Sequence, residues 1–137
     1  MDNKRTHLEL IQGVINRLST NSFLLKGWSV VLVSALFALA APESRPAFVY
    51  LAYIPAVVFW GLDGYFLWQE RLYRALYDHV RTLDEAAIDF SMDTSSFNNG
   101  RGRRWGEAVL SRTLLAFHGV LILAVFIVMV LALTNRR

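Results

Sequence analysis

Hydrophobic residues are gathered into three long runs along the chain, at residues 22–41, 47–68 and 113–134. These runs are 20, 22 and 22 residues long, and each holds at most one side chain that carries a full charge at neutral pH. A helix rises about 1.5 Å per residue, so each run would span roughly 30 Å, the thickness of a bilayer core. The pattern therefore predicts an all-α polytopic membrane protein with three transmembrane helices.

A shorter amphipathic pattern precedes the first run. Apolar side chains recur at steps of three and four residues over residues 7–19, which indicates an amphipathic N-terminal helix. Residues Thr6 to Glu9 fit a T-x-x-E capping box, so this helix is expected to begin there. The polar stretch at residues 19–22 either kinks the helix or lets it continue into the first span.

The second run does not end at the expected membrane boundary. Its apolar stripe continues over residues 69–84, while charged residues at steps of three and four occupy the opposite face, a spacing that favours ion pairs within a helix. One helix is therefore expected to run from Ala47 to near Asp84 and to project into the cytoplasm. Its projecting stripe contains Leu72, Leu76, Val80 and Leu83, with Tyr73 and Tyr77 beside it.

An apolar stripe on a projecting helix needs a covering partner. Either the N-terminal amphipathic helix or the same helix of a neighbouring subunit can supply it, and the second choice predicts a homo-oligomer. Small residues form a further expected packing face, because they let helices approach closely in lipid. These small residues are Gly61 and Gly64 in the second run and Ser34, Ala38 and Ala41 in the first.

The two connections between the runs differ in length. Residues 42–46 allow only a tight turn, so the first two spans are expected to be antiparallel neighbours. Residues 85–104 contain polar clusters and an Asn-Asn-Gly turn signal without a helical period, which predicts a loop ahead of the third span. With 137 residues, the chain is expected to form a single membrane domain.

The composition agrees with a membrane protein and excludes some chemistry. Apolar residues make up 55% of the chain and charged residues 18%, which is low for a soluble domain. There is no cysteine, so disulfides, thiolate nucleophiles and cysteine-based metal sites are excluded. The sequence contains no phosphate-binding loop, nucleophile elbow or zinc motif. We therefore expect a non-enzymatic protein without a cofactor or a metal.

Basic residues are distributed unevenly about the three runs. By the positive-inside rule, the crowded end is cytoplasmic, so the N-terminus and residues 69–112 lie inside and the C-terminus lies outside. A cleaved signal peptide ending near residues 34–44 is the competing interpretation, but Asp2 and Glu9 in the leading segment argue against it. Of the 14 Lys and Arg, 11 flank the cytoplasmic end: Lys4, Arg5, Arg17, Lys26, Arg71, Arg74, Arg81, Arg101, Arg103, Arg104 and Arg112.

Three ionisable side chains interrupt the runs at one depth. Lys26, Asp63 and His118 lie four or five residues inside the cytoplasmic ends of their spans, about 6–8 Å below the membrane edge. We expect an intramembrane polar layer in which Asp63 meets Lys26 first and His118 second, because an unpaired carboxylate at this depth is costly. The layer either forms a relay or a gate, or it only balances charge while Lys26 reaches the headgroups.

A basic cluster precedes the third span. Arg101, Arg103 and Arg104 are followed by Trp105, an aromatic residue suited to the membrane interface. Attraction to anionic lipid headgroups is worth about 1 kcal/mol for each basic side chain near the surface. The segment is also compatible with RNA binding, but we expect the lipid bilayer, not nucleic acid, to be the partner.

One spacing on the projecting helix suggests catalysis. Arg74 and His79 match the R-x4-H spacing of HEPN-type ribonucleases. An arginine and an imidazole on one helix can activate a ribose hydroxyl and stabilise the phosphorane. Twelve arginines and three histidines make such a pair common by chance, so this match carries little weight.

Two stretches of the sequence look familiar: NRLSTNSFLL at residues 16–25, and DGY followed by ERLYRALY within residues 63–77. They resemble small bacterial membrane proteins of the RipA and SLATT-like kind. The resemblance covers about residues 10–80, and the third span departs from the simpler two-span members. It implies an oligomeric protein of the bacterial inner membrane that acts as a pore or membrane-disturbing effector, with an association with antiviral defence.

These patterns lead to one hypothesis and two alternatives. We expect a homo-oligomeric inner-membrane protein that forms a pore or depolarises the membrane when a cytoplasmic signal or protein partner reaches the helical extension. The first alternative is a non-conducting scaffold or partner subunit of a membrane complex. The second is a membrane-tethered ribonuclease that uses Arg74 and His79.

Overall fold

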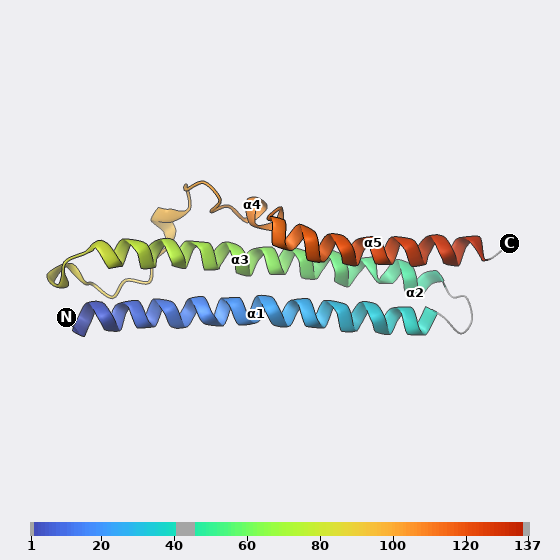
Figure 1. Ribbon diagram of the computed structural model, residues 1–137, viewed down its shortest axis with the longest axis horizontal. Coiled ribbons are helices and arrows are strands. Elements are labelled where there is room, and N and C mark those ends of the chain that lie inside the picture. The colour runs from blue at the N-terminus through green and yellow to red at the C-terminus, as the bar shows by residue number, and fades with distance from the viewer. Residues whose placement is uncertain (1, 41–45, 136–137) are drawn as a thin grey trace.

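The computed structural model describes residues 2–40 and 46–135 of the chain, and those residues form helices and loops without strands. Three long helical segments lie side by side and alternate in direction (Figure 1). The all-α prediction is therefore confirmed. In chain order the helices are α1 (Asp2–Ala40), α2 (Pro46–Leu51), α3 (Tyr53–Thr82), α4 (Trp105–Val109) and α5 (Arg112–Thr134), with short 3-10 turns at Glu85–Ala87 and Ser95–Phe97.

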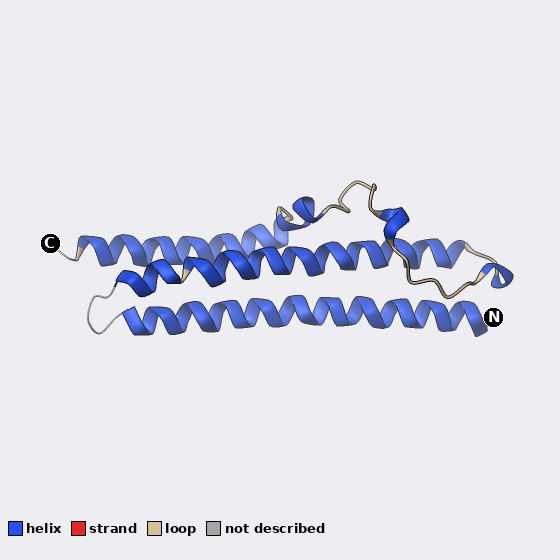
Figure 2. Cartoon of the chain, turned by 180° about the vertical axis from the view of Figure 1, so that it is seen from behind, coloured by secondary structure: helices blue, strands red, loops and turns tan. Residues whose placement is uncertain are grey.

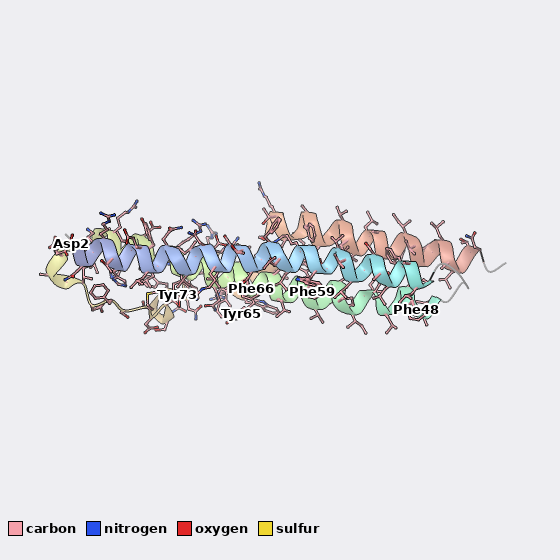
Figure 3. The ribbon with its side chains drawn as sticks, turned by 90° about the horizontal axis from the view of Figure 1, so that it is seen from below. Asp2, Phe48, Phe59, Tyr65, Phe66 and Tyr73 are labelled. Atoms are coloured by element: carbon pink, nitrogen blue, oxygen red, sulfur yellow. The ribbon has the colours of Figure 1, made fainter. Side chains whose placement is uncertain are left out.

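Three segments are long and apolar enough to cross a membrane: Asp2–Ala40, Ala47–Thr82 and Arg112–Thr134. Many of their large apolar side chains are exposed, and Figure 3 shows side chains projecting outward along the helices. Phe23 is 76% exposed and Val120 is 68% exposed. Because soluble proteins rarely expose continuous apolar surface of this extent, lipid is the environment that these helices fit.

The N-terminal amphipathic segment and the first span form one continuous helix, α1. Of the two alternatives at residues 19–22, continuation into the first span is therefore the one found, whereas the expected start at the Thr6–Glu9 capping box is wrong because α1 begins at Asp2. Glu9 does not cap, because its carboxylate accepts from Arg5 Nε at 2.8 Å on the same helix. The polar residues that follow do not break α1 either: Thr20 Oγ1 donates to the Asn16 carbonyl, and Ser19 donates across to α3.

The second span begins as α2 and continues as α3 after a short irregularity at Ala52. Pro55 explains this irregularity, because it has no N–H to donate to the carbonyl of Leu51 and its ring crowds that carbonyl. Beyond residue 68, α3 runs on without a break to Thr82, so the predicted helical extension is confirmed. We call the region where α1 starts and α3 ends the extension end; it is at the left in Figure 1 and at the right in Figure 2.

Two apolar clusters hold the helices together. The span core joins α1, α2, α3 and α5, and the extension core joins α1 to the far half of α3. The buried residues of the span core are Val33, Ala40, Val49, Ala52, Ala56 and Val125. Those of the extension core are Ile11, Ile15, Leu76 and Val80.

The apolar stripe of the extension is covered by α1 of the same chain. Leu72, Leu76 and Val80 are all buried, and Leu83 is half-buried. Of the two partners that the sequence left open, α1 is therefore the one that the structure uses. The stripe is therefore a helix-packing face within one chain, where α1 covers it.

Residues 85–104 return along α3 as a loop, as predicted, and Figure 1 shows this segment crossing back over α3 toward α4. Its course is determined by apolar contacts, because Ile88, Met92 and Phe97 pack against the extension core. Phe90 has a left-handed backbone with φ of 57°. The loop thus covers the extension core and leads the chain back to the start of the third span.

Replacing Leu76 with alanine should destabilise the folded protein by about 2–5 kcal/mol, because it leaves a cavity between α1 and α3. Leu10 on α1 is 52% exposed, so Leu10→Ala is the matched control and should change stability by less than about 0.5 kcal/mol. Denaturant unfolding in detergent micelles measures both. Equal effects of the two substitutions would contradict the packing of α1 on the extension.

Candidate functional site

A charged group is buried where α1, α3 and α5 meet. Asp63 of α3 has no exposed surface, and residues of the two neighbouring helices surround it. The structure brings together Lys26, Asp63 and His118, the three side chains that the sequence predicts at one depth. Ser22 joins them, and we call Ser22, Lys26, Asp63 and His118 the charge cluster.

The two carboxylate oxygens of Asp63 have different partners. Oδ2 lies 2.6 Å from Lys26 Nζ and 2.8 Å from His118 Nε2, so α1 and α5 both bind the same oxygen atom. Oδ1 accepts a hydrogen bond from the Ser22 hydroxyl. Lys26 Nζ also donates to Ser22 Oγ at 2.9 Å, which closes the network on α1. Asp63 therefore links three helices through one side chain.

Ser22 was not among the residues expected in this layer. It lies four residues before Lys26, and on a helix residues four apart share a face. That spacing was the signal that could have identified it. Its hydroxyl supplies Asp63 with a neutral donor, so the carboxylate is satisfied on both oxygens.

Aromatic rings enclose His118. The Trp60 indole stacks on its imidazole, with ring centroids 6.0 Å apart and an angle of 8° between the planes. The neighbouring Phe117 ring meets the imidazole edge-on at 5.0 Å. His118 is fully buried, and its Nδ1 has no hydrogen-bond partner. The imidazole is thus held in a nearly apolar enclosure with one polar contact, Asp63.

The short helix α4 packs on α3 beside the charge cluster. Each of the two helices donates an indole N–H to a backbone carbonyl of the other. Trp60 Nε1 donates to the Val109 carbonyl at 3.0 Å, and Trp105 Nε1 donates to the Gly61 carbonyl at 3.1 Å. A Cβ added to Gly64 would lie 2.3 Å from a Val109 methyl carbon, so only glycine allows this approach. Gly61 and Gly64 are therefore a helix-packing face, as expected, and their partner is α4.

The chain ahead of α4 is also tied to α3. Trp68 Nε1 donates to the Arg103 carbonyl at 2.7 Å, and Arg71 Nη1 donates to the Gly102 carbonyl at 2.8 Å. These bonds fix where the chain enters α4. They thereby help to position the start of α5, whose second turn carries His118 to Asp63.

The basic cluster lies on the surface beside α4. Arg101 and Arg104 are exposed, Arg103 is half-buried over Gly100, and Trp105 is half exposed. Leu110, just after α4, is 64% exposed, so an apolar side chain accompanies the basic ones. Contact with lipid headgroups through these residues stays a prediction.

Arg74 and His79 do not form a common site. Arg74 makes a bidentate contact with Glu70 Oε1, at 2.9 Å from Nε and 2.7 Å from Nη2. The His79 ring lies against Phe97 at 5.8 Å. Five residues along a helix place the two side chains about 140° apart around its axis. The geometry therefore gives no support to the ribonuclease hypothesis.

The described part of the chain has no group of three metal-binding side chains close enough to hold a metal ion. Comparisons with protein-family models, with curated proteins and with solved structures find no match to this chain. The charge cluster is the feature of this molecule that invites a functional explanation, because ionisable groups within a membrane span are rare and expensive.

Asp63→Leu should destabilise the protein, because it leaves Lys26 and His118 without their acceptor. The loss should be smaller than the roughly 3–5 kcal/mol typical of a fully buried pair, since Lys26 is partly exposed and can turn toward water. Adding Lys26→Met should recover part of the loss. Thermal unfolding of the two variants in detergent tests this, with Arg5→Met at an exposed ion pair as the control. A double variant less stable than Asp63→Leu would contradict pairing between the two side chains.

Proposed function

We propose that this protein is a homo-oligomeric membrane effector that lets ions cross the bacterial inner membrane when the charge cluster rearranges. The observation that carries the proposal is the closed Lys26–Asp63–His118 arrangement within the membrane-spanning part of three helices. In this packing the charges satisfy one another inside a single chain. A shift of any one helix would expose charged groups to water near the membrane surface.

The charge cluster is an unusual means of holding a helix bundle together. The span core already joins the same helices through apolar contacts. Replacing a buried ion pair by apolar residues is often neutral or stabilising, so charge is a poor choice for structure alone. Charged side chains can pair with one another in a closed packing and face water in a rearranged one. Apolar residues cannot supply such a second state.

A conducting path would run between chains. The centre of the bundle is filled by the span core, in which Val33, Ala56 and Val125 are buried. Ser34 and Ala38 are exposed on α1, although both are small residues of the kind that pack closely in lipid; Ala41 lies outside the described residues. This exposed small-residue face supports association of several copies around a shared path.

The extension offers a route for a signal. Since α1 and α3 each run without a break from the extension core to the charge cluster, a force on their ends reaches Lys26 and Asp63. A cytoplasmic protein partner bound at the extension end would act in this way. The crowding of basic residues at that end supports a cytoplasmic N-terminus and an outer C-terminus. A role in antiviral defence rests on the RipA and SLATT-like resemblance.

Purified protein in anionic liposomes tests the proposal. Asp63→Leu should raise the basal release of a trapped ion several-fold over the parent chain, because the closed packing loses its central acceptor. Asp63→Asn should do so less, since its amide retains an acceptor oxygen. A lipid-facing control, Val57→Leu, should behave like the parent. No release from the parent or from any Asp63 variant would refute an ion-conducting function.

A non-conducting scaffold is the second candidate. It is favoured by two features of a single chain: the charges of Lys26 and Asp63 are paired, and the extension stripe is covered, without a second copy. A scaffold would show no ion release in any variant. It would instead retain a membrane partner when purified from native membranes under mild detergent.

A cysteine at Ser34 should form crosslinks between copies in membranes, because the exposed small-residue face is the proposed contact. The chain has no native cysteine, so single substitutions report on one position each. Val57→Cys on the exposed side of α3 is the matched control and should crosslink less. Crosslinks of equal yield at both positions, or none at Ser34, would argue against association through this face of α1.

A further inference from the structure

His118 has a ring nitrogen that the charge cluster does not use. Its Nε2 contacts Asp63 Oδ2 at 2.8 Å, whereas its Nδ1 is buried without a hydrogen-bond partner. Most buried polar atoms in folded proteins have at least one partner. The free nitrogen therefore needs an explanation in terms of what it can bind.

The partners of Asp63 determine where the imidazole proton sits. Lys26 Nζ contacts Oδ2 at 2.6 Å and Ser22 donates to Oδ1, so the carboxylate is ionised and acts only as an acceptor. His118 must then donate to it from Nε2. The neutral ring carries one proton, so its Nδ1 is a bare acceptor.

In this state the charge cluster is electrically neutral. The charged groups that face His118 are Lys26 from α1 and Asp63 from α3, and its other neighbours are the rings of Trp60 and Phe117. From α4, the acidic side chain is Glu107, which is exposed. A proton added to Nδ1 would give the cluster a net positive charge in apolar surroundings and a charged donor with no acceptor.

We propose that His118 Nδ1 is a proton-binding site, and that binding of a proton there replaces Lys26 by His118 as the counter-ion of Asp63. Once His118 is charged, it competes with Lys26 for the same oxygen, Oδ2. The Lys26 side chain is 23% exposed on a flexible stem and can carry its ammonium group to water or headgroups, whereas His118 is fully enclosed. Asp63 then pairs with His118, and α1 loses its charged bond to α3.

Acidification is thus expected to loosen α1 from the other two helices. In the loosened packing water reaches Nδ1 and can accept a hydrogen bond from the added proton, so the folded protein is expected to lose stability as the pH falls. Histidine is the side chain that ordinarily changes charge between about pH 5 and about pH 8. As a trigger of ion passage this inference rests on the proposed function, but proton binding itself does not.

Nitrogen-15 NMR of the full chain, labelled at histidine and reconstituted in lipid, tests the site directly. The His118 signals are assigned by their loss in His118→Gln. Near pH 8 we expect a neutral ring with its proton on Nε2, and near pH 5 a ring protonated on both nitrogens. A neutral ring protonated on Nδ1, a ring already charged at pH 8, or a ring unchanged across this range would overturn the proposal.

Thermal unfolding across the same pH range tests the consequence. The midpoint temperature of unfolding should fall by several degrees on acidification in the parent and by clearly less in His118→Gln. The glutamine amide can still donate to Asp63 but cannot become charged. His79→Gln, at an exposed imidazole, should follow the parent. Equal losses in parent and His118→Gln would refute the coupling, and the NMR result stands alone if that variant does not fold. A chain that titrates as expected but passes no ions would refute only the proposed function.

Discussion

The fold depends on one carboxylate that accepts bonds from two other helices. Asp63 receives Lys26 and Ser22 from α1 and His118 from α5, and all of these contacts lie within the span region. In lipid, apolar contacts between helices have little advantage over contacts with acyl chains, so polar contacts contribute a large share of specificity. The opposite charges of Lys26 and Asp63 cancel, which makes a charged carboxylate tolerable within a membrane span.

A second polar bridge complements the first and fixes the register of α1 on α3. Ser19 Oγ donates to Glu70 Oε2 at 3.0 Å, one helical turn from the bond between Ser22 and Asp63 on α1. Apolar stripes alone permit neighbouring helices to slide by a turn, whereas paired polar groups permit one alignment. The apolar residues of the extension core therefore need not determine the alignment of α1 and α3 on their own.

Helix positions and the depth of charged residues were predictable, because both follow from local periodicity and a constant rise per residue. Lys26, Asp63 and His118 could be assigned to one level by counting. The partner of the stripe around Leu76 was not predictable, since α1 and a second chain satisfy the same pattern and only tertiary packing decides. The docking of α4 on Gly64 was missed as well, because five residues carry too little periodicity to mark a helix.

The continuity of α1 makes it a lever with its support near the middle. Ser22 lies 20 residues from Asp2 and 18 residues from Ala40, or about 30 Å and about 27 Å along the axis. The extension core holds one arm and the span core holds the other, and a rigid rod supported near its middle moves its two ends in opposite directions by similar distances. A displacement of α1 at the extension end would therefore strain the span core at the far end of the same helix, in the reverse direction.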